Sequence, residues 1–525
     1  MKITNKLKNI IIISTIGLTS VTTLSFLSAF LSSFVAFILI YKFKLLERFI
    51  DDNNYLIENI EYIISFILTT YSIYYFLTFW RSLSSNIYII PFAVLAIPSL
   101  FVIYLILIRN VLPIILNFFQ NLSKAEKIFF IVSTVCMTII IFNIYSNTNA
   151  FYYPINKNTG KPKLYNVIYS SDNGGLIRQD SFKNFKGSEN DLRQPLFGVF
   201  SFPFGLVSEG VARANIFSGY IISYSFMISF FQVLLLSVMA ILISRMVTKK
   251  DSLLVMILFG ISFPTILFAI NIEQFTIATF FLILLIYNWV QKDKPNPLLF
   301  CMASGTLITS GVLLPFILKK DKIKKYILEG IKYCLIFIII IIVVGLFCTF
   351  VDNILNYSKF MKYMGKEINF GDKMLQYINF VSSCLITPSA MIERLSADNV
   401  SYQLAPVTSV NILGIIILMI AIISFILNRS EKIVQVSFGW IIYSFIILCI
   451  MGWGTSENGL ILYALYFSWA FIILIYKFIQ KLFDNDLMRK IVLSTIIIGI
   501  LFINTNGIID IVKFGIEYYP TRNAK

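Results

Sequence analysis

The sequence predicts an all-α protein, a polytopic bundle of transmembrane helices. Of its 525 residues, 58% are hydrophobic and only 13% are charged, and the mean hydropathy is +0.82. A water-soluble domain cannot bury so large an apolar fraction. Apolar runs of about 20 residues recur along the chain, and each is long enough to cross about 30 Å of hydrocarbon as a helix.

The basic excess of the chain indicates topology. The formal net charge is +16, but the lysines lie at the ends of the apolar runs. Lys and Arg flank membrane spans on the cytoplasmic side, so Lys2, Lys6 and Lys8 place the N-terminus in the cytoplasm. Part of the excess also fits an AT-rich coding sequence. No nucleic-acid partner is expected.

Counting spans from this N-terminus gives about thirteen crossings. The run 10–41 is basic at both ends and is predicted to form a hairpin of two short helices rather than a cleaved signal peptide. Residues 111–122 are predicted to form an interfacial helix. The other predicted spans are 60–80, 87–108, 128–145, 216–243, a tight pair over 253–290, 327–351, 412–427, 434–451, 460–478 and 491–504, with the C-terminal tail outside.

The run 298–318 is treated differently because five lysines follow it within seven residues, namely Lys319, Lys320, Lys322, Lys324 and Lys325. A single crossing would place them outside the cell. The run is therefore predicted to enter the membrane and return near 304–310 as a re-entrant helical pair, which is tolerated only when buried against other helices. An ordinary span that violates the charge rule is the alternative.

Three parts of the chain are expected. Residues 1–127 are an added N-terminal transmembrane module, 128–480 form the core, and 481–525 hold the last span and an external tail. Two larger external loops, 146–207 and 352–407, belong to the core.

The residue types limit the chemistry. Histidine is absent, which excludes Ser-His and Cys-His nucleophiles and the commonest metal ligand. The six cysteines are scattered without a Cys-x-x-Cys pair, so we interpret them as small buried apolar side chains. Acid–base chemistry must therefore depend on Asp, Glu, Lys or Tyr.

Three polar clusters fall on the predicted outer face. They are 189–193, Glu273 with Gln274, and 452–459, which holds Trp453, Glu457 and Asn458. Acidic residues in turns at membrane depth are costly unless they are paired or functional. Their convergence on one side predicts a single outward-facing site in the cell membrane.

Within the first cluster, Asp191 is followed by Arg193 and then by an apolar aromatic segment that begins at Pro195. A carboxylate held near an arginine and partly shielded from water can stay ionised and act as a base, and Arg193 can bind a phosphate. Glu189 and Asp191 could together hold a divalent cation, although two carboxylates one residue apart are a weak metal signature. No cofactor is indicated.

Several short motifs resemble the GT-C superfamily of integral membrane glycosyltransferases, bacterial cell-surface members in particular. They are an acidic outer loop before Pro195-Leu196-Phe197, the Asn-x-Glu-Gln outer turn at 271–274, a lysine-rich return after a broken apolar segment, and the run 454–467. The resemblance covers 128–478 in order, with residues 1–127 as an addition.

The resemblance implies an enzyme that moves a sugar from a polyprenyl-phosphate donor to a glycan, lipid or protein acceptor on the outer face, with inversion. It implies that Asp191 is the general base toward the acceptor hydroxyl, with Glu189 as a second candidate. Charge that develops on the leaving phosphate favours a nearby cation. The expected substrate-binding residues are Arg193, Arg178, Arg213, Glu273, Gln274, Trp453, Glu457 and Asn458.

Other interpretations of the sequence stay open. Aromatic residues such as Trp453 can stack on a sugar or belong to an interfacial belt. A polysaccharide polymerase or ligase would use cations such as those in the 352–407 loop, Lys359, Lys362, Lys366 and Arg394. A lipid-linked sugar flippase or other transporter would need ionisable residues at mid-membrane and related halves, for which the sequence gives little support.

Overall fold

A computed structural model describes residues 114–164, 166–183, 192–214, 219–248, 251–318, 323–344, 346–396, 399–456 and 459–521. The predicted hairpin over 10–41 and the predicted spans 60–80 and 87–108 lie outside these residues. Four predicted site residues, Glu189, Asp191, Glu457 and Asn458, also lie outside them. Residues 114–120, inside the predicted interfacial segment, are helical.

The chain divides into two compact units. One comprises residues 1–123 and 334–355, and the other comprises 124–333 and 356–525. Helix α15 (Ile323–Val344) contributes to both. In the first unit, its second half is followed by α16 (Phe347–Leu355), and the rings of Phe337 and Phe350 pack 6.3 Å apart. All site residues described below belong to the second unit. The domain boundaries expected at 127 and 480 stay predictions.

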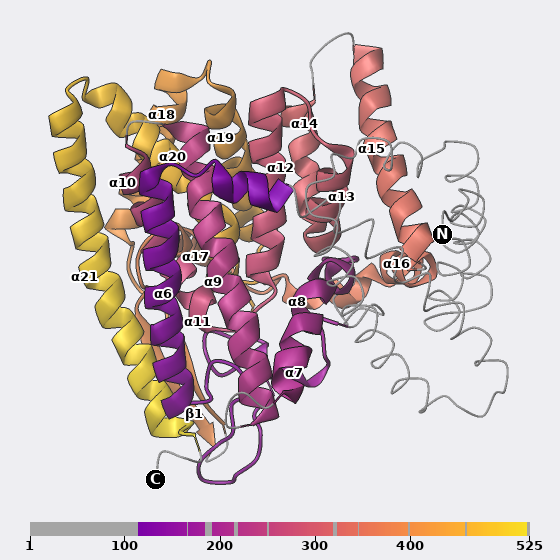
Figure 1. Cartoon of the computed structure of the whole chain (residues 1–525), viewed down its shortest axis with the longest axis vertical. Coiled ribbons are helices and arrows are strands. Elements are labelled where there is room, and N and C mark those ends of the chain that lie inside the picture. The colour runs from indigo at the N-terminus through magenta and orange to yellow at the C-terminus, as the bar shows by residue number, and fades with distance from the viewer. Residues whose placement is uncertain are drawn as a thin grey trace. The chain divides into compact units, whose positions relative to one another are not determined.

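Within the described residues, six helical segments are long and apolar enough to cross a membrane, or seven if a bent pair counts as one span. Helices α9 and α20 are largely buried, whereas α6 and α21, which run along the bundle (Figure 1), expose apolar side chains such as Ile131 and Phe502. Exposed apolar faces of this extent suit contact with lipid, so the chain is a helical membrane protein. The six segments are α6 (Lys124–Asn147), α9 (Tyr220–Val247), α12 (Phe275–Lys292), α19 (Lys432–Ser444) with the π-helix η3 (Phe445–Ile450), η4 (Leu460–Tyr463) with α20 (Ala464–Leu482), and α21 (Asp486–Tyr518).

Most predicted spans within the described residues coincide with helices, including α18 (Ile412–Asn428). The count of about thirteen crossings remains a prediction. The predicted last span ends at 504, but α21 continues to Tyr518. The reason is that Asn504 is satisfied inside the bundle, where its Nδ2 atom donates to the carbonyls of Ile261 and Leu385 at 2.7 and 2.8 Å. A polar residue bonded in this way does not need to end a helix.

The arm predicted as one span over 253–270 is bent by 58° between α10 (Ser252–Gly260) and α11 (Phe263–Ile270). Pro264 lies in the first turn of α11, where its missing N–H is no loss, but it cannot continue α10. The hydroxyl of Ser262 donates to the carbonyl of Phe259 at 2.8 Å, which satisfies one acceptor at the break.

The segment predicted to be re-entrant is broken at Leu307, where the backbone is extended. It consists of α13 (Pro297–Thr306), the 3-10 helix η1 (Ile308–Leu313) and α14 (Leu314–Ile317). The hydroxyls of Tyr333 and Tyr326 on α15 donate to the carbonyls of Pro295 and Pro315 at 2.7 and 3.0 Å. These tyrosines are about 10 Å apart along α15, whereas a straight helix would separate the two prolines by about 30 Å. The segment is therefore not one straight helix.

Several connections meet at the end of the bundle where α6 and α21 finish, which we call the loop end. Asn149 N–H donates to the carbonyl of Tyr519 at 3.0 Å, and Ile272 N–H in the α11–α12 turn donates to that of Phe151 at 3.1 Å. The loop end thus joins segments that the sequence assigned to one side of the membrane.

Ion pairs lie at the opposite end of the helices. Arg245 Nε is 2.6 Å from Glu126 Oε1, and Arg489 Nε is 2.5 Å from the buried Asp251 Oδ2. These pairs hold together the starts of α6, α10 and α21 and the end of α9.

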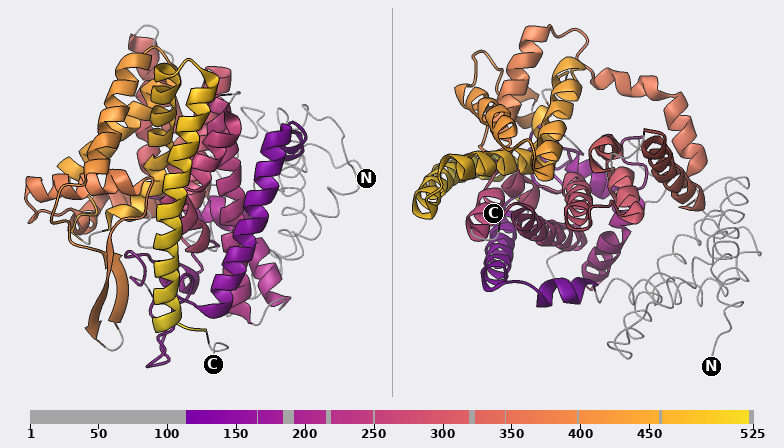
Figure 2. Two further views of the ribbon diagram at one scale, coloured as in Figure 1. Left: turned by 90° about the vertical axis from the view of Figure 1, so that its left-hand side faces the viewer. Right: turned by 90° about the horizontal axis from the view of Figure 1, so that it is seen from above.

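The two long polar stretches contain helices and a pair of strands. A two-stranded antiparallel hairpin corrects the all-α prediction, and Figure 2 shows it projecting beside the end of α21. Its strand β2 also pairs with the segment around Ile168, since Tyr169 N–H donates to the carbonyl of Tyr402 at 2.7 Å. The elements are α7 (Asn173–Arg178), α8 (Phe197–Arg213), η2 (Tyr357–Tyr363), α17 (Phe370–Ser383), β1 (Ala390–Ser396) and β2 (Asn399–Leu404).

Candidate functional site

The turn between α11 and α12 carries Glu273 and Gln274 and is fixed from three sides. Gln232 on α9 donates from its Nε2 atom to the carbonyls of Phe268, Asn271 and Glu273 at 3.0 to 3.3 Å. A buried turn without such donors would leave carbonyls unsatisfied at a cost of about 1–3 kcal/mol each. Further bonds come from the hydroxyl of Tyr145 to the carbonyl of Ile270 at 2.7 Å and from Asn173 to the side chain of Asn271 at 3.1 Å.

Glu273 is only 2% exposed. Its Oε1 atom accepts a hydrogen bond from the backbone N–H of Asp172, at the start of α7, at 2.7 Å. Burial and, to a smaller extent, the nearby Asp172 carboxylate raise the pKa of Glu273 to about 8, against the opposing effects of Arg193 and of the backbone N–H groups of Asp172 and Gln274. Gln274, the N-cap residue of α12, is also buried.

Arg193 packs against two neighbouring aromatic rings, whose centres are 5.9 Å apart. Its guanidinium carbon is 5.4 Å from the centre of the Tyr363 ring and 6.0 Å from that of Trp453. Such cation–π contacts orient a guanidinium without neutralising it. The Nε atom of Arg193 is buried and has no hydrogen-bond partner among the described residues.

The backbone around Arg193 is held by the tip of the broken segment. Ile308 N–H donates to the carbonyl of Arg193 at 2.9 Å, and Leu196 N–H donates to the carbonyl of Gly305 at 2.8 Å. A side chain at 305 would place its Cβ atom 2.7 Å from that of Leu196, so only glycine allows this approach. The position of Arg193 therefore depends on the turn between α13 and η1.

Trp453 is presented by a tight loop after η3. Gly452 and Gly454 have φ angles of +70° and +78°, which favour glycine. The indole Nε1 of Trp453 donates to the hydroxyl of Tyr463 at 3.0 Å, and Gly454 N–H donates to the carbonyl of Tyr363 at 2.9 Å. A π-helix often occurs beside a functional site, and here η3 leads directly into this loop.

Gln194 and Tyr466 link the loop of Arg193 to the helix after Glu273. Gln194 Nε2 donates to the hydroxyl of Tyr466 at 3.2 Å, and the Tyr466 ring packs against that of Phe275 at 5.3 Å. Gln194 is 8% exposed, and its Oε1 atom has no partner in the described part of the chain. The structure thus brings Arg193, Glu273 and Trp453 into one connected group, which we call the arginine cluster.

Four residues that contact or connect the arginine cluster were not predicted from the sequence, namely Asp172, Tyr363, Gln194 and Tyr466. Gln194 and Tyr466 could have been predicted from the sequence, because Gln194 is adjacent to Arg193 and Tyr466 lies in the 454–467 run. No local signal marks Asp172 or Tyr363, which are distant in sequence from their contacts.

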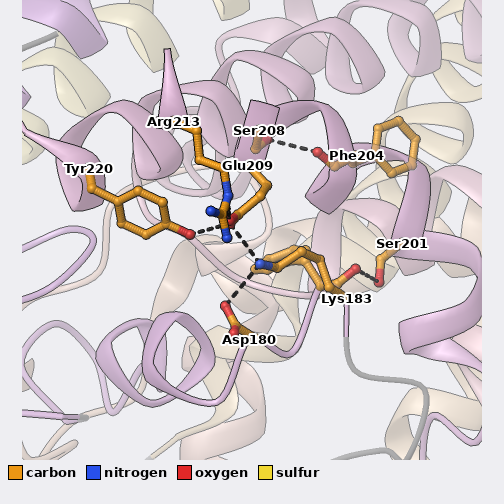
Figure 3. Close-up of polar contacts among 9 residues, drawn as sticks. Asp180, Lys183, Ser201, Phe204, Ser208, Glu209, Arg213 and Tyr220 are labelled. Carbon is orange, nitrogen blue, oxygen red and sulfur yellow. Dashed lines mark hydrogen bonds and ion pairs between the residues drawn. The ribbon is translucent and has the colours of Figure 1, made fainter. Parts of the chain in front are cut away.

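Arg213 belongs to a different set of contacts, which we call the Glu209 cluster (Figure 3). Its Nε atom is 2.5 Å from Glu209 Oε1, while the amine of Lys183 is 2.8 Å from Glu209 Oε2 and 3.3 Å from Asp180. The hydroxyl of Tyr220 also donates to Glu209. Burial acts to raise the pKa of Glu209, but the hydrogen bonds from Lys183 and Tyr220 outweigh it and hold this pKa below the usual carboxyl range.

Arg178, the last residue of α7, is exposed. No direct contact that the structure records joins Arg178 or Arg213 to the arginine cluster. Of the three predicted phosphate-binding arginines, Arg193 alone packs against the predicted site residue Trp453 and acts electrostatically on Glu273. In the described ranges, no group of three or more Asp, Glu or Cys side chains could hold a metal ion.

Comparisons of the chain with protein-family models, curated proteins and solved structures gave no match.

Proposed function

We propose that this chain is a membrane glycosyltransferase of GT-C-like architecture, with about thirteen spans and a re-entrant pair. It transfers a sugar from a polyprenyl-phosphate donor to a glycan, lipid or protein acceptor on the outer face of the cell membrane. The observation that carries the proposal is the convergence of Arg193, Glu273 and Trp453 at one group of loops beside apolar helices.

Arg193 is suited to the donor phosphate. Its guanidinium is oriented by two rings and has a buried N–H without a protein partner among the described residues. A guanidinium is the side chain that best matches phosphate geometry, and a cation fixed in advance stabilises the charge that develops on a leaving phosphate.

Aromatic and polar groups around Arg193 suit a sugar. Trp453 and Tyr463 are only partly buried, so their rings can contact a ligand. Gln194 Oε1 is a buried acceptor without a partner in the part of the chain described here. Sugar hydroxyls both donate and accept hydrogen bonds. A site with an unpaired donor and an unpaired acceptor therefore favours a sugar over a ligand without hydroxyl groups.

In the proposed reaction, an acceptor hydroxyl attacks the anomeric carbon of the donor while the bond from that carbon to the phosphate oxygen breaks. The hydroxyl proton passes to a carboxylate, and the phosphate leaves as an anion beside Arg193. Asp191 is the proposed base from its sequence position, two residues before Arg193, with Glu189 as the second candidate.

The alternatives receive less support from the described residues. Arg394, one of the cations that favoured a polymerase, donates to the hydroxyl of Tyr518 at 3.2 Å, which is a structural contact at the end of α21. In the spans α6, α9, α12 and α20, charged residues stand only near the ends. A flippase that moves a charged carrier would need them at mid-membrane.

Glycan analysis of a deletion strain tests the proposal, with rescue by wild type, Asp191→Asn or Arg193→Ala. Loss of one sugar or branch from surface polymers, restored by the wild type alone, is the expected result. Loss of long chains with intact single repeat units would replace the proposal with a polymerase. Complete lipid-linked units trapped on the inner face would replace it with a flippase.

A further inference from the structure

Gln194 has a buried side-chain amide of which only the nitrogen is bonded. The residue is 8% exposed, and its Nε2 atom donates to the hydroxyl of Tyr466 at 3.2 Å. Its Oε1 atom is also buried and accepts no hydrogen bond from any residue that the structure describes. Most buried side-chain polar atoms in folded proteins are satisfied, because an unsatisfied one is costly. The amide oxygen therefore calls for a donor other than the described residues.

Tyr466 holds a second unused group close to this oxygen. Its ring is buried against Phe275 at 5.3 Å, and its backbone carbonyl accepts from the indole N–H groups of Trp440 and Trp469 at 2.7 and 2.8 Å. The Tyr466 hydroxyl oxygen already accepts from Gln194, so its own proton is left to donate, and no described residue accepts it. Gln194 and Tyr466, which we call the amide–tyrosine pair, thus offer one acceptor and one donor from side chains fixed in place.

A hydroxyl is the ligand group that matches both atoms of the amide–tyrosine pair. It donates to Gln194 Oε1 through its hydrogen and accepts from Tyr466 through its oxygen. An ionised phosphate or carboxylate only accepts, so it would leave the amide oxygen without a donor. An ammonium group only donates, so it would leave the tyrosine proton without an acceptor. The pair therefore favours a hydroxyl over either kind of charged group.

The amide–tyrosine pair belongs to the same closed ring of contacts as the proposed phosphate-binding residue. The rings of Tyr463 and Tyr466 both pack on Phe275, with centres 6.0 and 5.3 Å away. The hydroxyl of Tyr463 accepts from the indole of Trp453 at 3.0 Å. Trp453 in turn packs against Arg193, which directly precedes the amide in the chain and closes the ring. A phosphate at Arg193 thus has the pair close by, and the proposed donor carries a sugar on that phosphate.

We propose that Gln194 and Tyr466 recognise one free hydroxyl of the donor sugar and so determine which sugars the chain accepts. The inference rests on the proposed function and deepens it, because it restricts the donor to sugars that are unmodified at the recognised position. A sugar that lacks this hydroxyl leaves two buried polar groups unpaired, and an acylated one cannot donate to the amide. Gln194 and Tyr466 are therefore specificity-determining residues.

The test measures donor binding to the full-length protein in phosphatidylcholine nanodiscs. The probes are a polyprenyl phosphate without a sugar, the polyprenyl phosphates of glucose, galactose and mannose, and the monodeoxy analogues of whichever hexose binds most tightly. For the wild type, that hexose should bind about tenfold or more tightly than the bare phosphate. At least one analogue, which lacks the recognised hydroxyl, should bind about 5- to 150-fold more weakly than the hexose.

Two variants show whether the amide–tyrosine pair makes this discrimination. Gln194→Leu removes the amide at similar size, and Tyr466→Phe removes only the hydroxyl. Each should reduce the ratio of the affinities for the hexose and the discriminated analogue by about fivefold or more, whereas a merely structural role would weaken both probes equally. Both should bind the bare phosphate like the wild type. Gln435→Leu, exposed in the first turn of α19, is the matched control and should keep the wild-type ratio.

The outcomes separate the inference from the proposed function. Equal affinities of the wild type for the hexose and all of its deoxy analogues would overturn the inference, and so would an unchanged ratio in Gln194→Leu and Tyr466→Phe. Either result would leave the phosphate site intact if the bare polyprenyl phosphate binds and Arg193→Ala weakens that binding. Failure of the wild type to bind any of the probes would overturn the proposed function together with the inference.

Discussion

The amine of Lys183 and the carboxylate of Glu209, both buried, meet at 2.8 Å. Lys183 immediately precedes the segment 184–191, which carries the proposed base, and Glu209 lies on α8, which follows the same segment. This pair therefore fixes the chain on one side of the segment, while the contacts of Arg193 fix it on the other.

Glu209→Gln should destabilise the protein by about 3–5 kcal/mol, because it removes the nearer and buried one of the two carboxylates that compensate the buried Lys183. The measurement is thermal unfolding in detergent, with Asp510→Asn as the control at an exposed ion pair. The double variant Lys183→Met with Glu209→Gln should recover part of the loss. Equal stability of Glu209→Gln and the wild type would remove the anchoring role.

The stability contributed by Glu209 should depend on pH. Its pKa is lower in the folded state than the usual carboxyl value of about 4.3. Its contribution is therefore complete above that value and is lost as the pH falls through the folded pKa. The difference in melting temperature between the wild type and Glu209→Gln should be constant near neutral pH and shrink below about pH 4. A difference that grows on acidification would contradict this assignment.

Asp191→Asn should leave the protein folded and inserted but slow sugar transfer by about 100- to 10,000-fold, the usual contribution of a general base. Transfer in purified membranes and thermal unfolding measure the two properties. Glu189→Gln is the matched control and should retain most activity. If Glu189→Gln is the inactive variant, the base moves to Glu189, and normal activity in both variants would exclude this segment as its source.

Arg193→Ala should raise the KM for the lipid donor about 10- to 100-fold, since a hydrogen bond to a charged group contributes about 1.5–3 kcal/mol. Arg178→Ala, which removes an exposed arginine from α7, should change it by less than about twofold. Kinetics at varied donor and acceptor concentrations make the comparison. A larger effect on the KM for the acceptor would reassign Arg193 to acceptor binding.

Gln232→Leu should destabilise the α11–α12 turn, because three buried carbonyls lose their common donor. We expect a melting temperature several degrees lower and reduced sugar transfer, although Gln232 lies outside the proposed ligand contacts. Ser237→Ala on the same helix, where a hydroxyl pairs with Ser133 at 2.9 Å away from the turn, is the control. Full activity in Gln232→Leu would show that the turn is held by its other contacts.

The orientation can be measured by cysteine labelling in a background without native cysteines. Asn158→Cys, at an exposed position in the predicted outer loop, should react with a membrane-impermeant reagent in intact cells. Lys481→Cys, exposed at the end of α20, should react only after permeabilisation. The reverse pattern would place the arginine cluster in the cytoplasm and exclude an external donor site.

Hydrophobic patterning by itself determined the class of fold. Runs such as 128–145 and 460–478 are helices because a backbone in an apolar surrounding must satisfy its hydrogen bonds within the segment. The break in the 298–318 run was also predictable, because the lysines at its two ends both favour the cytoplasmic side of the membrane, which a single straight span does not allow. The sequence further indicated which polar turns would share an end of the bundle.

Tertiary structure decided what local patterns do not encode. Asn504, in the middle of α21, is satisfied by the carbonyls of Ile261 in the α10–α11 bend and of Leu385, and strand β2 bridges to a segment more than 200 residues earlier. The different surroundings of Arg213 and Arg193 were also determined by the tertiary structure. Arg213 is paired with Glu209, whereas Arg193 packs against two rings and has no ion pair among the described residues, because the electrostatics of a charged side chain depend on what packs around it.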